Sequence, residues 1–258
     1  MRLGDGDLDS RRDQVAFYKE RVDSEEEITR PRGYPAFVQW LIQSKLKAAV
    51  GLYGPGLQPG LKVLAVCCGS GLDLELLTER DLTPLGLDLS LEAIRRAKER
   101  SRRFRTFYQL VCGDATALPF RDSSFDIVFV HDGLHHLEDP YAGAAEMIRV
   151  ARRGVVVAEP ATSPLTRFAV WIGISSDFEE AGNFVNRIDP TRLSAVFRQA
   201  GLTQVRTARE LCYYQPWTYR VYQLVEAIVG LSAMQRLHRL VNILVSRWGN
   251  SLRAAAWR

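Results

Sequence analysis

The amino-acid sequence predicts an α/β fold in which helices cover a doubly wound, mostly parallel sheet. Two observations predict this class. From residue 62 onward, short apolar runs alternate with segments of helical periodicity, which is typical of βα units that form a parallel sheet. In addition, a polar residue or a glycine follows each of the first four apolar runs, as expected at the ligand-binding edge of such a sheet. The 258 residues, 47% of them hydrophobic, are enough for one large core.

The first half of the predicted sheet contains four strands and two helices. Residues 63–67 (VLAVC) are apolar throughout, which is typical of a strand buried on both faces, and the Gly-Ser-Gly turn after them leads into a helix over 72–78. Ser90 is suited to cap a second helix that continues to about residue 100. The other strands are predicted at 85–88, 107–112 and 125–131.

Two further helices begin with the dipeptide Asp-Pro. Asp139 and Asp189 are suited to cap them, because proline is favoured in the first helical turn, and Gly201 is placed to end the second helix. Strands are predicted at 154–158 and 204–208. Three segments lie outside this alternation, and we expect them to form a lid and inserts on the core: residues 1–59, 161–188 and 217–248.

Charge and cysteine content exclude several classes of protein. Lys and Arg number 34 against 30 Asp and Glu, and this formal charge of +4 is too small for a protein whose affinity depends on nucleic-acid phosphates, so no nucleic-acid partner is expected. The four cysteines contain no CxxC pair, which argues against a zinc cluster or disulfide framework and favours a cytoplasmic location. The first 20 residues lack the apolar core of a secretory signal, and no apolar stretch has the length of a membrane span.

The predicted sheet edge combines a Gly-rich turn with two aspartates. Gly69 and Gly71 would let a ligand approach the backbone closely. Asp88, 17 residues after Gly71, is suited to accept hydrogen bonds from a ribose diol, and Asp114 from an exocyclic amine. Simpler roles stay open, with the glycines as a strand-to-helix turn, Asp88 as a helix cap and Asp114 as a turn residue.

Four runs of the sequence resemble the class I S-adenosylmethionine-dependent methyltransferases, and among these the type 11 group: VLAVCCGSG, GLDLS, GDATALPFRDSSFDIVFVHDGLHHLEDP and RRGVVVAEP. The Cys-Cys-Gly-Ser-Gly turn is particularly similar to the ubiquinone and menaquinone biosynthesis C-methyltransferases. The resemblance covers about residues 62–159. It implies a Rossmann-like, doubly wound, mostly parallel seven-stranded sheet with an antiparallel last strand, which we place at 249–255. A helical lid (1–59) would precede a methyltransferase domain (60–258) that carries inserts at 161–188 and 217–248.

The same resemblance implies S-adenosylmethionine as the cofactor and assigns its contacts by position. Backbone groups of the Gly-rich turn would hold the methionine part, while the two aspartates would meet the ribose and the adenine edge. His131 would lie near the methionine part or the sulfonium, Leu89 would cover one adenine face, and Tyr18 would contact the cofactor carboxylate. The implied cofactor-binding residues are Tyr18, Cys67, Gly69, Gly71, Asp88, Leu89, Asp114, Ala115 and His131.

Two positions depart from the family pattern. Members usually carry an acidic residue where this chain has Ala65, and a glycine where it has Cys67. The missing carboxylate removes a contact that helps to hold the cofactor amino group. Because a charged hydrogen bond is worth about 1.5 to 3 kcal/mol, we expect weaker cofactor binding unless the nearby Asp73 substitutes. A dinucleotide-binding dehydrogenase is the competing interpretation, but the third glycine of its G-x-G-x-x-G pattern is absent.

Three of the four histidines fall within six residues at the end of the fourth predicted strand. Histidine titrates near neutral pH and can accept a proton as a methyl group is transferred. Similarity to the phosphoethanolamine methyltransferases, which have an Arg-Asp-x-x-x-His arrangement here, favours His136 as the catalytic residue, with His135 as the second candidate and Asp132 orienting either ring. Alternatively, positioning alone suffices for an in-line displacement, and the second histidine packs beneath the site. No metal site is expected, because no further Cys or His stands at a familiar ligand spacing.

The region 217–248 combines many apolar residues with several arginines. A basic amphipathic segment of this kind can lie on an anionic membrane surface or cover a lipophilic acceptor, although a helical hairpin packed on the core or on a second copy has the same pattern. The sequence therefore predicts methyl transfer to oxygen or carbon of a small, apolar or lipid-like acceptor by a cytoplasmic protein with peripheral membrane contact through 217–248. The alternative is a non-catalytic nucleoside-binding or regulatory module, and the oligomeric state stays open.

Overall fold

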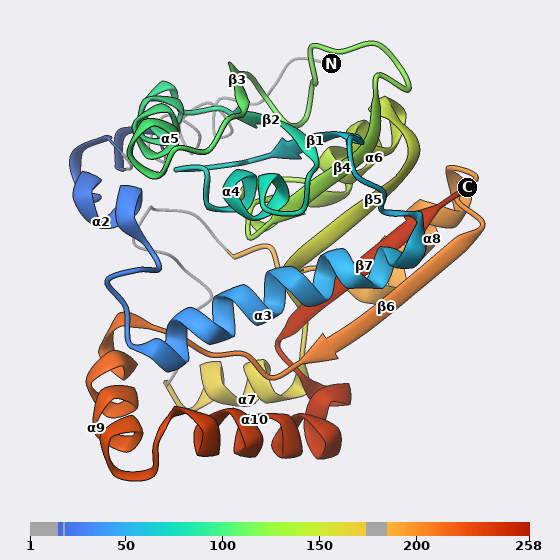
Figure 1. The fold of residues 1–258 in the computed structure, drawn as a ribbon. Coiled ribbons are helices and arrows are strands. Elements are labelled where there is room, and N and C mark those ends of the chain that lie inside the picture. The colour runs from blue at the N-terminus through green and yellow to red at the C-terminus, as the bar shows by residue number, and fades with distance from the viewer. Residues whose placement is uncertain (1–14, 18, 174–184) are drawn as a thin grey trace.

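The strands form a mixed sheet in a computed structural model that describes residues 15–17, 19–173 and 185–258 (Figure 1). This sheet has seven strands in the order β3-β2-β1-β4-β5-β7-β6. Strands β1 to β5 pair in parallel, whereas β7 runs antiparallel to both β5 and β6, which confirms the predicted sheet with its antiparallel last strand. The strands are β1 (Lys62–Val66), β2 (Thr83–Asp88), β3 (Gln109–Cys112), β4 (Phe125–His131), β5 (Ala151–Pro160), β6 (Gln204–Glu210) and β7 (Ser251–Trp257).

The helices predicted between the strands are present, with the predicted caps. Ser90, Asp139 and Asp189 each accept a hydrogen bond from a backbone N–H of the first helical turn, at 2.7 to 3.3 Å. Gly201, with a φ of 82°, follows the last of these helices. The helices are α4 (Leu72–Thr78), α5 (Leu91–Phe104), α6 (Pro140–Val150) and α8 (Pro190–Gln199).

The segments outside the βα alternation contain the remaining helices of the described residues. The longest helix, α3 (Ala36–Tyr53), lies against β5 and β7 on one side of the sheet and buries Val38, Ile42 and Leu46 (Figure 1). A lid function for residues 1–59 stays a prediction. The other helices are α2 (Ser24–Thr29), α7 (Pro164–Trp171), α9 (Tyr219–Val229) and α10 (Leu231–Val245), with short 3-10 turns η1 (Gly54–Gly56), η2 (Leu134–His136), η3 (Pro216–Thr218) and η4 (Ser246–Trp248).

Apolar side chains pack on both sides of the sheet. On one side, Met147 of α6 and Phe197 of α8 pack in a cluster with alternate residues of β4. On the other side, Leu46 of α3 and Leu74 of α4 pack with the intervening residues of the same strand. Because helices cover both sides, all residues of β4 except His131 are buried, including Asp126, whose carboxylate pairs with Arg152 and Arg153.

Some strand ends differ from the prediction for reasons of pairing. β3 begins at Gln109, the first residue in register with β2, and Phe107 before it is 85% exposed. β5 starts earlier than predicted, with Ala151 in register with Phe125 of β4, and both β5 and β6 end later than predicted because each pairs with β7 over seven residues. Because β7 is distant in the sequence, the residues of β5 and β6 give no local indication of how far this pairing extends.

The strand order reverses between β1 and β4, and this reversal positions the candidate site. From β1 the chain moves outward through β2 and β3, and then returns to β4 on the other side of β1. Val66 at the end of β1 pairs with Val130 of β4, so the Gly-rich turn lies beside His131. Ligands of open α/β sheets bind in the crevice that such a reversal leaves beyond the strand ends.

Candidate functional site

The turn after β1 is built from residues with positive φ. Gly69 and Gly71 have φ values of 50° and 86°, and Cys67 has a φ of 53° although it carries a side chain. This left-handed conformation favours glycine, and a non-glycine residue there costs on the order of 1 to 3 kcal/mol. A β carbon on Gly71 would lie 2.8 Å from the Tyr108 hydroxyl, so the turn also packs tightly against its neighbours.

Asp88 ties this turn to the start of α5. Its Oδ2 accepts a hydrogen bond from the Gly69 N–H, and its Oδ1 accepts one from the Ser90 N–H, both at 2.9 Å. Burial raises the pKa of the Asp88 carboxyl, although these two hydrogen bonds and the nearby charge of His136 act to lower the pKa. Asp88 thus helps to shape the turn, and it lies where a ribose-binding residue is predicted.

The residues predicted to contact adenine follow β2 and β3. The Gly113 N–H donates to the Asp88 carbonyl at 2.9 Å, so the two strand ends are joined. Asp114 Oδ1 accepts hydrogen bonds from the backbone N–H and the hydroxyl of Thr116, both at 2.7 Å. Leu89 exposes 43% of its surface, whereas Ala115 is buried. The predicted adenine contacts therefore lie at one edge of the sheet.

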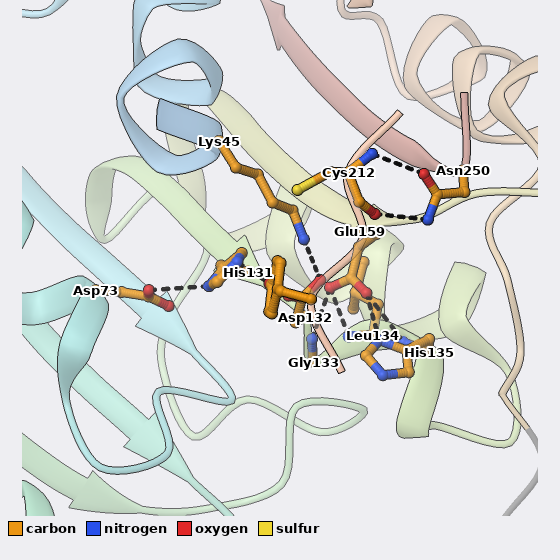
Figure 2. A network of polar contacts seen from close by, with 11 residues as sticks. Lys45, Asp73, His131, Asp132, Gly133, Leu134, His135, Glu159, Cys212 and Asn250 are labelled. Carbon is orange, nitrogen blue, oxygen red and sulfur yellow. Dashed lines mark hydrogen bonds and ion pairs between the residues drawn. The ribbon is translucent and has the colours of Figure 1, made fainter. Parts of the chain in front are cut away.

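His131 at the end of β4 lies between two carboxylates (Figure 2). Its Nδ1 is 3.1 Å from Asp73 Oδ1, and its Nε2 is 3.0 Å from Asp132 Oδ2. Burial alone would lower the pKa of His131, but the charges of Asp132 and Asp73 outweigh it and raise the pKa to about 9. His131 is therefore protonated at neutral pH and holds two anions in place.

A buried lysine completes this network from a distant helix. Lys45 of α3 donates to Asp132 Oδ1 at 2.5 Å, and the Tyr214 hydroxyl donates to Asp132 Oδ2 at 3.2 Å. Burial lowers the pKa of Lys45, but the negative charge of Asp132 more than compensates, so the pKa is raised overall. Burial likewise opposes ionisation of Asp132, yet His131 and Lys45 hold its pKa well below the usual range. Asp132 is consequently an anion held by two cations.

Glu159 at the end of β5 organises the loop that follows β4. This fully buried carboxylate accepts hydrogen bonds from the N–H groups of Gly133 and Leu134, both at 2.8 Å, and its other oxygen lies 2.8 Å from His135 Nδ1. The rings of His135 and His136 lie 4.0 Å apart. His135 is thus bound to a structural carboxylate, while His136 is near enough to Asp88 to affect the pKa of that carboxyl.

Asp132, His135 and Glu159 also have ligand atoms within 4.8 Å of one another, a spacing that could hold a metal ion. Their present partners oppose this use. Lys45 and His131 already bring positive charge to Asp132, and backbone N–H groups already bind Glu159. A further cation beside two existing cations would be repelled, so the donor set does not favour a metal.

The structure brings together Cys67, Gly69, Gly71, Asp88 and His131 at the sheet edge, whereas Tyr18 lies outside the described residues. The sequence prediction did not include Lys45, Tyr214 or Glu159. One signal existed for Lys45, because it stands between Leu41 and Ala49 on the apolar side of a predicted helix, where a lysine is unusual. Glu159 had the same signal as Asp88, because it directly follows the predicted strand 154–158, whereas Tyr214 had none.

Part of the chain is similar in sequence to known proteins. A family described as "Methyltransferase domain", of the type 11 group, matches residues 64–158. A demethylmenaquinone methyltransferase from Renibacterium salmoninarum is 34% identical over 154 residues, which are 59% of this chain and 61% of that protein. The chain therefore matches about three fifths of the length of this curated relative.

Solved structures share the fold at low sequence identity. Magnesium protoporphyrin IX methyltransferase from Synechocystis PCC 6803, solved with bound SAH, has a TM-score of 0.59 and 15% identity, covering 98% of this chain and 95% of that one. The cyclase SpnF has a TM-score of 0.55 and 16% identity, covering 85% of this chain and 82% of the other. The seven-stranded fold is thus common to proteins with different named activities.

Proposed function

We propose that the chain transfers a methyl group from S-adenosylmethionine to a small, apolar, quinone-like acceptor, at carbon or oxygen. The match of residues 64–158 to a family described as "Methyltransferase domain" and the similarity to a demethylmenaquinone methyltransferase support this proposal. The observation that carries this proposal is the hydrogen bond between Asp88 and the Gly69 N–H. It joins an acidic strand end to a Gly-rich turn at the point where strand order reverses, which is the arrangement suited to a nucleoside.

The residues at this turn fit the cofactor. The Ser70 hydroxyl is buried and has no hydrogen-bond partner within the described part of the chain. A β carbon on Gly69 would have nothing within 4 Å, so the space next to the turn is open. A buried hydroxyl without a partner beside open space favours a polar ligand, since an unsatisfied buried polar group is costly.

Each predicted contact then has a proposed role. Backbone groups of Cys67, Gly69 and Gly71 would hold the methionine part, and Asp88 would bind the ribose hydroxyls. Asp73 and His131 would meet the charged amino-acid end of the cofactor, with Asp73 supplying the carboxylate that Ala65 lacks. The remaining proposed contacts are Leu89, Asp114 and Ala115 around adenine, and Tyr18 near the cofactor carboxylate.

The cofactor would supply an electrophilic methyl group on a sulfonium. The acceptor atom loses a proton when it forms its bond to this methyl group. His136 is our proposed base for this proton. Asp132 is a poor base because His131 and Lys45 hold its pKa well below the usual range. His135 is buried, with its Nδ1 2.8 Å from Glu159 Oε2, so an acceptor would reach its ring less easily than the ring of the half-buried His136. We therefore assign positioning roles to Asp132 and His135, through His131 and the loop after β4.

The alternative, a non-catalytic nucleoside-binding module, is favoured by one observation. Ala65 is buried in the middle of the sheet, where family members carry an acid, and Cys67 takes the place of a glycine. Binding of a nucleoside without methyl transfer would be the expected behaviour of such a module. A single experiment separates the two functions.

The experiment incubates the protein with methyl-labelled S-adenosylmethionine and a reduced 2-polyprenyl-1,4-naphthoquinone in detergent micelles, followed by mass spectrometry. Label in the quinone is the expected result. His136→Ala should lower the rate about 100-fold while binding of S-adenosylhomocysteine is retained, because a general base contributes at least that much. Retained binding with no label in the quinone, or in any apolar fraction of a cell extract, would instead support the non-catalytic module.

A further inference from the structure

The helices α9 and α10 present apolar side chains to solvent. Val221, Leu224 and Ile228 lie at helical spacing on α9, and all three are exposed. On α10 the corresponding set is Leu237, Leu240, Ile243 and Leu244, of which Ile243 and Leu244 are 76% and 74% exposed. We call these seven residues the α9–α10 face. The apolar side of a surface helix normally faces the protein core, whereas on α9 and α10 these apolar residues face solvent.

Polar contacts on the opposite side fix this orientation. Asn242 Oδ1 accepts a hydrogen bond from the Leu211 N–H at 2.7 Å, and His238 Nε2 lies 3.0 Å from the Leu211 carbonyl. On α9, Glu226 Oε2 accepts the Phe37 N–H at 3.1 Å. The two helices thus turn their hydrogen-bonding residues inward to the protein. Rotating either helix to hide its apolar side would break these bonds.

Within residues 217–248 the exposed charged side chains have one sign. Glu226 is the single acidic residue in 217–248, and its carboxylate accepts the hydrogen bond from Phe37 of α3. The exposed ionisable groups are arginines, and two of them lie over tryptophan rings: Arg247 at 3.8 Å from the Trp248 centroid and Arg239 at 5.7 Å from that of Trp40. The full set is Arg220, Arg236, Arg239 and Arg247.

The neighbouring helix α7 extends the apolar surface. The Ser163 hydroxyl, which caps α7, donates to the Trp248 carbonyl just after α10. None of the residues of α7 is buried, and Trp171 at its end is 79% exposed. Figure 1 shows α7, α9 and α10 together at one end of the molecule, beyond α3.

We propose that this end of the molecule binds the surface of an anionic lipid bilayer, with the α9–α10 face in the acyl boundary and the arginines at the headgroups. Apolar exposure combined with arginine alone is complementary to anionic lipid. Tryptophans at the margin are typical of the membrane–water interface. Within the described ranges no helix has both the length and the hydropathy to cross a bilayer, so the contact is peripheral. The proposal does not depend on the proposed methyl transfer.

The test is sedimentation of the full chain with vesicles of phosphatidylcholine containing one third phosphatidylglycerol, compared with vesicles of phosphatidylcholine alone. We expect binding to the anionic vesicles that weakens as salt is raised. The double variant Ile243→Glu/Leu244→Glu should bind at least tenfold more weakly, and Arg236→Gln/Arg247→Gln should lose most of the preference for anionic lipid. The matched control is Phe107→Glu, an exposed apolar residue next to β3, which should bind like the unaltered chain.

Two results would overturn the proposal. One is equal binding of Ile243→Glu/Leu244→Glu and the unaltered chain to anionic vesicles, with both folded by circular dichroism. The other is absence of vesicle binding together with a dimer that these substitutions dissociate in analytical ultracentrifugation, which would make the face an interface between two copies of the chain.

Discussion

Gly133 lies so close to Cys67 that a β carbon at position 133 would come within 2.3 Å of the Cys67 β carbon. The loop after β4 is therefore packed directly on the turn after β1. Glu159 reinforces this contact, because it holds the Gly133 N–H at 2.8 Å. The turn after β1 and the loop after β4, which form the two halves of the candidate site, are consequently in direct contact.

This approach predicts that Gly133→Ala is strongly destabilising. A β carbon cannot be accommodated against another β carbon at that distance, so one of the two backbones must shift, and overpacking typically costs about 1 to 3 kcal/mol. Replacing Cys67 by glycine removes the obstructing atoms. In urea denaturation, the double variant Cys67→Gly/Gly133→Ala should be more stable than Gly133→Ala alone. Equal or lower stability of the double variant would contradict the proposed contact.

His131 predicts a specific pH dependence of stability. Its pKa is raised from 6.5 to about 9 in the folded protein, so its stabilising contribution is fully present below about pH 6.5 and is lost as the pH rises through 9. The difference corresponds to about 3 kcal/mol. Denaturant midpoints at pH 6 and pH 9.5 should therefore differ more for the unaltered chain than for His131→Gln. Parallel pH profiles of the two proteins would contradict this assignment.

Lys45 and Asp132 should be energetically coupled. Removing one partner of a buried ion pair costs about 3 to 5 kcal/mol, and we expect Lys45→Met to fall at the low end because His131 and Tyr214 still contact Asp132. The double variant Lys45→Met/Asp132→Asn should lose less stability than the sum of the two single variants. A double-mutant cycle by chemical denaturation measures the coupling, and strict additivity would mean that the ion pair contributes nothing.

Local patterns predicted the elements that depend on local chemistry. Phe125–His131 and Leu72–Thr78 have the predicted ends, because a mostly apolar run marks the strand and the Gly-Ser-Gly turn marks the start of the helix. The cap residues Asp139 and Asp189 were found for the same reason. The extended length of β5 was missed, since it depends on pairing with a strand near the end of the chain.

The residues of the candidate site also separate into those with a local sequence signal and those without one. Residues at strand ends, such as Asp88 and His131, were predicted because the edge of a parallel sheet collects them. Lys45 and Tyr214 were missed because they reach Asp132 from segments more than 80 residues away along the chain. Cys67 was noted only as a residue at a position where the family usually has glycine, and the sequence predicted neither its positive φ nor its contact with Gly133.

The central claim is that the turn after β1 and Asp88 bind a methyl-donor nucleoside, and calorimetric titration with S-adenosylhomocysteine tests it most directly. We predict micromolar affinity for the unaltered chain and at least tenfold weaker binding for Asp88→Ala. The control Asp122→Ala, altered at an exposed carboxylate before β4 that pairs with Arg149, should bind normally. Absence of binding by the folded, unaltered chain, or an affinity unchanged by Asp88→Ala, would contradict the claim.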